Sequence, residues 1–389
     1  MKGRKLRMGM IGGGQGSFIG EVHRLAANLD GQIELVCGAF SSKPEVSRAS
    51  GQALFLPEER CYATYAEMIE KEAGLPDGER MDFVSIVTPN HVHFEPTQLA
   101  LEAGFPVILD KPMCFDFDEA LQMQEIIERT RLPFALTHTY TGYPMVKQAK
   151  SMVKEGALGK IKKINVEYPQ GWLSEKLEDT GAKQAAWRTD PKRSGKSGCF
   201  GDIGTHAANM AEYVTGLKIT SVLSRLKTVV EGRLLDDDAD VLLEFEGGTH
   251  GLLSASQVST GEENGIKIRI YGEKGGLEWR QEDNNSLAVT MLGQPKQILR
   301  AGGNNAYLSE MALAACRVPA GHPEGYLEAF ANIYKNFVRS IRAHAAGQSL
   351  DFTIYDYPGI EDGVRGMALI DAMVASTEGG NVWTDVAVK

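Results

Sequence analysis

The chain has 389 residues and a formal net charge of −10, from 51 acidic and 41 basic side chains. This length exceeds what one hydrophobic core usually serves, so two domains are expected. The acidic balance argues against a nucleic-acid binder and against a protein that binds anionic membranes, because both partners are polyanions. A small neutral substrate remains compatible with it.

Cysteine spacing and hydropathy bear on the compartment. The five cysteines are scattered without C-x-x-C spacing, which indicates neither a disulfide framework nor a zinc site, and no metal is expected. Residues 1–7 are basic, but the apolar stretch after them is short and broken by glycines, unlike a signal peptide. No window approaches the ~20 apolar residues of a membrane span. We expect a cytoplasmic protein.

In the first part of the chain, strand-like apolar runs alternate with helical patterns, which is typical of a parallel sheet wrapped by helices. The expected strands are residues 6–11, 33–40, 83–87, 106–109 and 134–137. The expected helices are residues 18–29, 65–73, 93–103 and 117–129. Residues 1–140 are therefore predicted to form a Rossmann domain of the α/β class.

After residue 145 longer alternating stretches predict a second, α+β domain over residues 141–389, with a large, mainly antiparallel open sheet. The expected strands are residues 160–168, 221–230, 239–246, 249–258, 266–271 and 276–280. Amphipathic helices at residues 204–215, 325–344 and 357–376 are expected to cover one face and to leave the other open to a partner subunit. The acidic run at residues 236–240 lacks EF-hand spacing and is expected to be a solvated turn.

A glycine-dense turn follows the first strand. Gly12 and Gly14 match the first two glycines of G-x-G-x-x-G, while Ser17 takes the third position. Such a turn lets backbone amides approach a pyrophosphate at a helix start, whereas the alternative is a flexible loop. The predicted cofactor-binding residues here are Gly12, Gly14, Gln15, Gly16, Ser17 and Phe18.

The end of the second strand normally selects between NAD and NADP. No carboxylate occurs there to bond a ribose 2′-hydroxyl, and the residues are Ser41, Ser42 and Lys43. Hydroxyls and a cation can accept a 2′-phosphate, but a Ser-rich helix cap before Pro44 explains them equally well. Both NAD and NADP stay open as the cofactor.

Two further strand ends lie at the carboxyl edge where cofactors bind in open α/β sheets. Thr88, Pro89 and Asn90 follow the third strand. Asn90 can bond the nicotinamide ribose or cap the next helix, and the two roles can coexist. Lys111 ends the fourth strand and suits a proton donor or an anchor for a sugar oxygen. Pro112 restricts the backbone there and is compatible with a cis bond that fixes where the amine points.

Asp202 and His206 are spaced i, i+4, which predicts one shared face of a helix. Asp202 can then orient the imidazole while His206 takes the proton from a hydroxyl. In the alternative, Asp202 is a helix N-cap and His206 a core residue. Aromatic and polar residues suited to stacking on a sugar and bonding its hydroxyls are Tyr140, Gln170, Trp172, Trp187, Arg188 and Tyr326.

The order of these motifs resembles the glucose-fructose oxidoreductase, inositol dehydrogenase and rhizopine-catabolism family, Gfo/Idh/MocA, over nearly the full length. Its T-P-N-x-x-H segment is matched by Thr88, Pro89, Asn90 and His93, and its E-K-P motif by Asp110, Lys111 and Pro112, with aspartate in place of glutamate. Its D-x-x-x-H pair falls on Asp202 and His206. The resemblance implies that His206 acts as the base and that Lys111 assists it. It also implies that the T-P-N-x-x-H and E-K-P segments bind the cofactor.

Within that family the sugar-contacting segments look like those of the inositol and levoglucosan dehydrogenase type. The resemblance implies a sugar or cyclitol substrate bound by Lys111, Tyr140, Gln170, Trp172, Trp187, Arg188, Asp202, His206 and Tyr326. It also implies a homodimer or homotetramer formed through the second domain's sheet. The expected function is an NAD(P)-dependent dehydrogenase; an NAD-dependent glycosidase acting through a keto-sugar and a cofactor-sensing regulator are the alternatives.

Overall fold

The computed structural model describes residues 3–348 and 352–387. The chain divides into two compact units: residues 1–139 with 326–364, and residues 140–325 with 365–389. Within the described residues, every helix is too short or too polar to cross a lipid bilayer.

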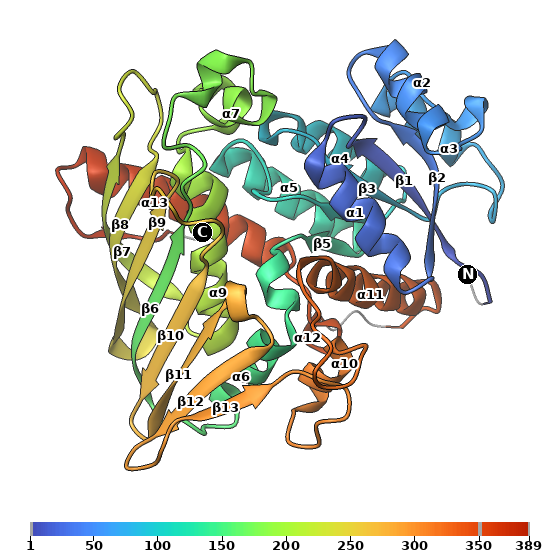
Figure 1. The fold of residues 1–389 in the computed structure, drawn as a ribbon. Helices are drawn as coiled ribbons and strands as arrows, with labels where there is room; N and C mark the ends of the chain where they lie inside the picture. The colour runs from blue at the N-terminus through green and yellow to red at the C-terminus, as the bar shows by residue number, and fades with distance from the viewer. Residues whose placement is uncertain (1–2, 349–351, 388–389) are drawn as a thin grey trace. The chain divides into compact units, whose positions relative to one another are not determined.

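The first unit contains a parallel five-stranded sheet in the order β2-β1-β3-β4-β5 (Figure 1). Its strands are β1 (Leu6–Gly12), β2 (Ile33–Ala39), β3 (Phe83–Val87), β4 (Val107–Leu109) and β5 (Phe134–Leu136). The helices that connect them are α1 (Phe18–Leu29), α2 (Pro44–Ala53), α3 (Tyr65–Ala73), α4 (Phe94–Glu102) and α5 (Phe117–Thr130). Strand β3 is buried along its whole length, as a central parallel strand should be. The expected Rossmann sheet is confirmed, and its strand order reverses between β1 and β3, where ligands of such sheets bind.

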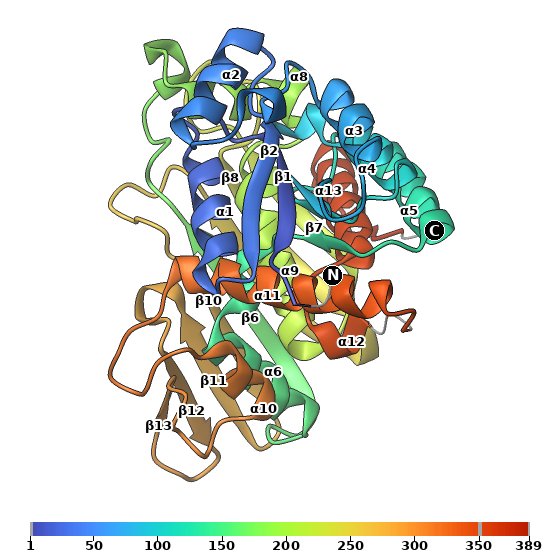
Figure 2. The ribbon, with the colours of Figure 1, turned by 90° about the vertical axis from the view of Figure 1, so that its right-hand side faces the viewer.

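Helix α11 (Tyr326–Ala345) packs in the first unit, which corrects the expectation that residues 325–344 cover the second sheet. It lies against α1, as Figure 2 shows. Phe330, Tyr334 and Phe337 share one core with Val22 and Ala26 of α1. The amphipathic period predicts the helix, but it says nothing about which apolar surface the helix covers.

A buried polar cluster fixes α11 to the sheet. The Tyr334 hydroxyl lies 2.7 Å from His23 Nδ1 and 2.9 Å from Ser85 Oγ. His23 Nε2 lies 4.0 Å from a carboxylate oxygen of Asp110. Burial, opposed by the Asp110 carboxylate, lowers the pKa of His23 to about 4, so the imidazole is neutral at pH 7.

The second unit contains a nine-stranded sheet in the order β13-β12-β11-β10-β6-β9-β8-β7-β14, in which β6 and β9 run parallel and the other neighbours antiparallel. The strands are β6 (Ile161–Pro169), β7 (Ile219–Lys227), β8 (Asp238–Phe245), β9 (Thr249–Ser256), β10 (Lys267–Gly272), β11 (Gly275–Arg280), β12 (Ser286–Met291), β13 (Gln297–Arg300) and β14 (Thr384–Asp385). The mainly antiparallel sheet is confirmed. Strands β12, β13 and β14 were not expected.

Helices α6 (Pro144–Lys154) and α9 (Thr205–Thr215) pack on one face of this sheet. Helix α13 (Ile360–Glu378) begins in the first unit, and from residue 365 it belongs to the second. There Ser224 of β7 bonds the Met373 carbonyl and Arg365 pairs with Glu212. Along β9 the residues alternate between buried and exposed, so the opposite face of the sheet is open. The shorter helices are α7 (Lys183–Arg188), α8 (Pro191–Ser194), α10 (Glu310–Ala315) and α12 (Phe352–Tyr355).

Acid should destabilise the fold through His23. Its pKa is about 4 in the folded chain against 6.5 for an ordinary histidine, so above pH 6.5 neither state takes up a proton and the group costs nothing. As the pH falls from 6.5 to about 4, only the unfolded chain gains the proton, and the free energy of unfolding should drop by on the order of 3 kcal/mol.

Urea unfolding of the native chain and of His23→Gln at several pH values measures this effect. Between pH 6.5 and 4 the free energy of unfolding should fall less in the variant than in the native chain, because the variant lacks the contribution of His23. Equal slopes for the two proteins would show that His23 does not titrate in this way.

Candidate active site

The glycine-rich turn joins β1 to α1. Gly12, Gly13 and Gly16 have φ angles of 80°, 71° and 78°, in the left-handed region that glycine adopts without strain. Ser17 is the N-cap of α1, and its hydroxyl accepts a hydrogen bond from the Gly20 amide at 3.2 Å. The serine at the third motif position therefore starts the helix.

Two glycines set how closely the backbone approaches its neighbours. A Cβ at Gly14 would lie 2.8 Å from the Phe40 carbonyl oxygen, to which the Gly14 amide donates at 3.1 Å. A Cβ at Gly20 would lie 2.3 Å from Gly13 Cα. Gly20 thus brings α1 against the turn, although the motif did not mark it. A glycine in the first turn of the helix is the signal that could have found it.

These residues fit a dinucleotide. Helix α1 has twelve residues, and an α-helix leaves its first backbone amides without helical partners, which is the arrangement that binds pyrophosphate. The Gln15 amide is held by Ser50 Oγ at 3.1 Å, and Phe18 is exposed at the first helical position. The turn is therefore both fixed and accessible.

At the end of β2 the Ser41 hydroxyl accepts a hydrogen bond from the Lys43 amide at 3.2 Å. Lys43 is the N-cap position of α2 and makes no side-chain capping bond. The serines therefore shape the turn before α2 without capping the helix itself. Ser42 and Lys43 are exposed, so a hydroxyl and a cation face solvent where a ribose selector is expected.

Backbone carbonyls surround His93 at the carboxyl edge of the sheet. Its Nε2 lies 2.7 Å from the Thr88 oxygen and its Nδ1 2.8 Å from the Pro112 oxygen, and the side chain is fully buried. His93 thus links the loops after β3 and β4. Asn90 begins a 3-10 turn, and His93 holds the N-cap position of α4, which corrects the interpretation of Asn90 as that cap.

Lys111 follows β4, and the Lys111–Pro112 peptide bond is cis. Asp110 Oδ1 accepts hydrogen bonds from the Lys111 amide at 2.9 Å and from Thr137 Oγ1 at 2.8 Å. The carboxylate thereby fixes the backbone of the lysine. Burial and the Lys111 charge lower the pKa of His138 to about 3, so the lysine ammonium lies within electrostatic range of a buried imidazole.

Asp202 lies in a π-helical turn, Phe200–Gly204, which leads into α9. The helix is therefore π-helical at Asp202 and α-helical at His206, and π-turns often occur at functional sites. Asp202 Oδ2 accepts hydrogen bonds from Arg188 Nε at 3.1 Å and from Gln257 Nε2 at 2.8 Å. Gln257 is buried after β9, and no sequence motif marks it.

Asp236 anchors the start of this π-turn. Its carboxylate accepts hydrogen bonds from the Gly198 amide at 2.8 Å and the Phe200 amide at 2.9 Å, and burial raises its pKa. Asp237 is also buried and pairs with Arg233. The expectation of a solvated turn at residues 236–240 is therefore wrong, because Asp236 and Asp237 are buried and bind partners in the protein interior. No cluster suited to a metal ion occurs within residues 3–348 and 352–387.

The aromatic and polar candidates of the second unit gather around Asp202 and His206. The Arg188 guanidinium lies 4.3 Å from the ring centre of Trp187 and 5.9 Å from that of Trp172. The Tyr140 ring stands edge-on to the buried His206 imidazole, with 4.9 Å between centroids. The indole of Trp172 donates to Gln170 Oε1 at 3.0 Å.

The candidate residues thus fall into two groups. The first unit holds the glycine turn, Thr88, His93, Asp110 and Lys111, and the second holds Asp202 with His206 and their neighbours. Tyr326 belongs to the first unit, where its ring contacts Phe330. It is therefore not in the same unit as the other proposed substrate-contacting aromatic residues.

Comparisons with known proteins agree with this arrangement. Residues 6–138 match the oxidoreductase family with an NAD-binding Rossmann fold, and residues 146–278 match the GFO/IDH/MocA C-terminal domain. An uncharacterized oxidoreductase of Bacillus subtilis, YfiI, is 34% identical over 98% of this chain and 97% of its own length. The levoglucosan dehydrogenase of Pseudarthrobacter phenanthrenivorans is 26% identical over 98% of both chains.

Solved structures similar to this chain include an inositol dehydrogenase homolog from Azotobacter vinelandii. Its complex with NAD⁺ is 37% identical over 98% of both chains, with a TM-score of 0.93. Its complex with NADH and myo-inositol is 36% identical over 98% of both chains, with a TM-score of 0.90.

Gly20→Ala should weaken dinucleotide binding. The added methyl group meets the Gly13 backbone at 2.3 Å, so the turn must move away from α1. We expect at least a ~10-fold increase in Kd for the reduced cofactor, measured by fluorescence titration, because misplaced backbone donors lose most of their hydrogen-bond energy. Gly366→Ala is the matched control, since nothing lies within 4 Å of its added Cβ. An unchanged Kd for Gly20→Ala would contradict the proposed approach.

Proposed function

Because the chain belongs to the GFO/IDH/MocA family of NAD-binding oxidoreductases, we propose that it oxidises a secondary hydroxyl of a sugar or cyclic polyol, or reduces the matching ketone. The observation that carries the proposal is the buried His206 imidazole, set among hydrogen-bonded tyrosine and amide side chains next to the Asp202 turn. An imidazole titrates near neutral pH and suits the removal of a hydroxyl proton.

Each catalytic side chain has one role in the proposal. His206 takes the hydroxyl proton, and Asp202, held by Arg188 and Gln257, orients the histidine. Lys111 binds the same substrate oxygen and stabilises the negative charge that develops on it. NAD, when bound, accepts the hydrogen and its electron pair from the substrate carbon.

The first unit supplies the cofactor site. The glycine turn and Ser17 bind the pyrophosphate, with Gln15, Gly16 and Phe18 beside it, and Thr88, Pro89, Asn90 and His93 shape the edge near the nicotinamide. Asp110 and Pro112 fix the lysine. Ser41, Ser42 and Lys43 leave NADP acceptable beside NAD, because no carboxylate there repels a 2′-phosphate.

The substrate class follows from the relatives and from the wall around His206. One similar structure holds myo-inositol, and a curated relative is a levoglucosan dehydrogenase. Trp172 and Trp187 offer ring faces for the C–H surface of a pyranose or cyclitol, and Tyr140, Gln170 and Arg188 offer polar groups for its hydroxyls. Tyr326 completes the set of proposed substrate contacts.

The division of roles near residue 140, with cofactor binding before it and substrate binding after it, is part of this proposal. A cytoplasmic location is also part of it. It is supported by the cysteines, none of which takes part in a disulfide in the described chain.

The test is turnover with a panel of inositols, aldoses and anhydrosugars, offered with NAD⁺ or NADP⁺ and followed by absorbance of the reduced nicotinamide. Lys111→Ala and His206→Ala should each lower kcat by ~100-fold or more, because each removes a group that acts on the reacting oxygen. Thr260→Ala, on an exposed loop, should keep the native rate. Native rates in both alanine variants would contradict the assigned roles, and glycoside cleavage without net cofactor reduction would favour the glycosidase alternative.

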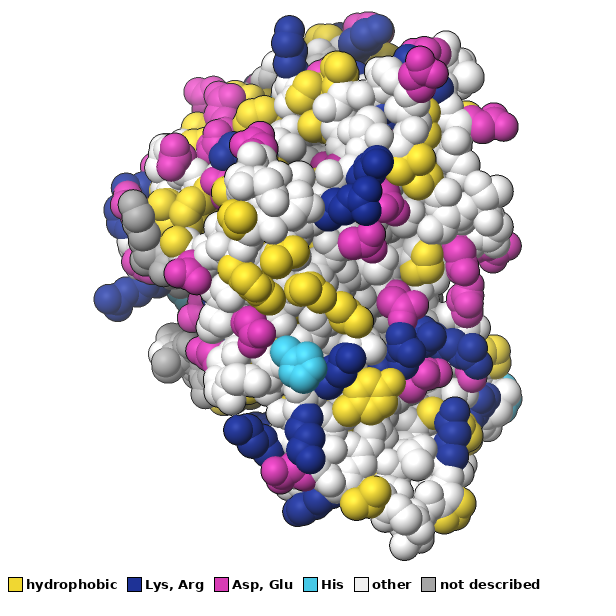
Figure 3. All heavy atoms as spheres, turned by 90° about the vertical axis from the view of Figure 1, so that its left-hand side faces the viewer, with side chains coloured by type: hydrophobic (Ala, Val, Ile, Leu, Met, Phe, Trp, Pro, Cys, Tyr) yellow, Lys and Arg dark blue, Asp and Glu magenta, His cyan; other side chains and the backbone are white. Residues whose placement is uncertain are grey.

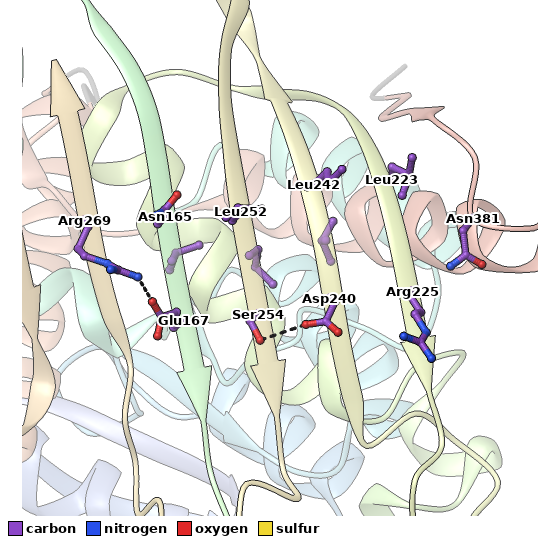
Figure 4. A pocket seen from close by; sticks show the side chains of 13 residues that line it. Asn165, Glu167, Leu223, Arg225, Asp240, Leu242, Leu252, Ser254, Arg269 and Asn381 are labelled. Atoms are coloured by element: carbon purple, nitrogen blue, oxygen red, sulfur yellow. Dashed lines mark hydrogen bonds and ion pairs between the residues drawn. The ribbon is translucent and has the colours of Figure 1, made fainter. Parts of the chain in front are cut away.

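We further propose that the open face of the nine-stranded sheet joins two copies of this chain, as a homodimer or as part of a homotetramer. Figure 3 shows hydrophobic side chains gathered on one face of the molecule, with charges of both signs around them. On the sheet, Leu223, Leu242 and Leu252 line a shallow pocket together with Arg225, Glu167, Asp240 and Arg269 (Figure 4).

A second copy fits this pocket better than a differently charged partner. Leu242 and Leu252 are 44% and 42% exposed, although they lie on central strands of the sheet. Arginines and carboxylates surround them in equal number, and a two-fold axis brings such a mixed patch against its own complement. Burial of these leucines against their symmetry mates would stabilise the dimer.

Leu242→Glu should break this association, because it places a carboxylate at the centre of the buried patch. Size-exclusion chromatography with light scattering should change from a dimer or tetramer to a smaller species. Leu292→Glu is the control, since Leu292 is 82% exposed in the turn after β12. A native chain that is already monomeric, or an unchanged mass for Leu242→Glu, would refute the interface.

A further inference from the structure

Three side chains of the second unit form a closed ring of hydrogen bonds. The Tyr168 hydroxyl donates to Asn264 Oδ1 at 2.8 Å, and Asn264 Nδ2 donates to the Tyr140 hydroxyl oxygen at 3.1 Å. The hydroxyls of Tyr140 and Tyr168 are bonded to each other and close the ring. Each member of the ring therefore both donates and accepts.

The neighbouring donors and acceptors determine which group donates in each hydrogen bond of the ring. An indole N–H can only donate, so the Trp172 bond to Gln170 Oε1 orients the Gln170 amide. Gln170 Nε2 then donates to Asn264 Oδ1 at 2.6 Å, which orients the Asn264 amide in turn. Asn264 Nδ2 faces the Tyr140 oxygen and Gln281 Oε1, so Tyr140 must donate its own proton to Tyr168.

The closed ring of hydrogen bonds sets the position of the Tyr140 aromatic ring, which makes an edge contact with His206. The planes of Tyr140 and His206 are 83° apart with centroids 4.9 Å apart, and both side chains are buried. Tyr140 also stacks on Tyr143, with 6.3 Å between the ring centroids, and the ring centroid of Tyr143 lies 5.2 Å from that of Trp279. Packing against Tyr143 thus holds the aromatic ring of Tyr140, and the closed set of hydrogen bonds holds its hydroxyl group.

We propose that Asn264 is a positioning residue that holds the imidazole of His206 through Tyr140. Asn264 lies in the loop between β9 and β10. Within the ring, Asn264 Nδ2 is the group that donates a hydrogen bond to the Tyr140 oxygen. Without it, the Tyr140 aromatic ring gains freedom to tilt, and its edge contact with the imidazole, which acts beside Asp202 in orienting His206, is weakened. This inference rests on the proposed role of His206 as the base.

The test compares Asn264→Ala and Asn264→Asp with the native full-length chain. Aspartate keeps the acceptor for Tyr168 and Gln170 but cannot donate to Tyr140, so it opens the ring at one bond with little change in size. We expect kcat for the polyol to fall about 10-fold to 100-fold and to change by more than KM, because a misoriented base slows the proton transfer directly, whereas Tyr140 and Gln170 supply only part of the proposed substrate binding. Thr260→Ala, which removes a hydrogen bond of the same loop outside the ring, is the control.

A second readout needs no turnover. With ¹³C-labelled histidine in the unliganded protein, the ring signal of His206, assigned with His206→Asn, should shift or broaden in both Asn264 variants and stay at its native position in Thr260→Ala. An unmoved signal together with native kcat in both Asn264 variants would overturn the proposal.

Tyr168→Phe supplies the remaining check, since it deletes a ring member and keeps the packing. Its effect on kcat should not add to that of Asn264→Ala, because both break the same ring. Full additivity would contradict a shared ring.

The two proposals fail in different ways. If His206 is not the base, His206→Ala keeps its activity while the Asn264 variants still move the His206 signal. If Asn264 has no positioning role, His206→Ala is inactive while the Asn264 variants behave like the native chain.

Discussion

Polar groups taken out of water must find hydrogen-bond partners, and this requirement fixes the local geometry around the candidate residues of each unit. In the first unit Asp110 satisfies the Lys111 amide and the Thr137 hydroxyl, so the lysine leaves the sheet from a fixed backbone. In the second unit Arg188 and Gln257 both donate hydrogen bonds to one carboxylate oxygen of Asp202. The side chains proposed to react are held by neighbours to which the proposal gives no chemical step.

The same requirement explains why distant segments are needed. Tyr334, more than 200 residues after β3, closes the buried cluster with His23 and Ser85 and so ties α11 to the Rossmann sheet. Asp236 supplies acceptors for the two amides that begin the π-turn ahead of Asp202. Each candidate motif is short, but the partners that stabilise it come from elsewhere in the chain.

Much of the fold could be predicted because it depends on local periodicity. The bounds expected for α1, α3 and β3 agree with the structure to the residue, since each has a clear apolar pattern and marked ends. Strand β13 was missed because its four residues are mostly exposed and carry no alternating burial. The placement of α11 was wrong because an amphipathic helix shows that it has a partner without showing which one.

The candidate motifs can be recognised in the sequence, whereas the residues that hold them in place cannot. Gly12, Lys111, Asp202 and His206 carry recognisable spacing, but the π-turn beneath Asp202 has no spacing signal of its own. Gly20, Gln257 and Asn264 support the candidate site through contacts with Gly13, Asp202 and Tyr140, and no sequence motif marks them. Only the folded chain brings those residues together.

The most direct measurement of the central claim follows the hydrogen itself. A polyol that the protein oxidises, beginning with myo-inositol, is deuterated at the carbon that becomes the ketone and incubated with NAD⁺, and the reduced cofactor is analysed by mass spectrometry. The account predicts that the deuterium is found in the nicotinamide ring of NADH. Deuterium released to water, or returned to a cleaved sugar without accumulation of NADH, would contradict it.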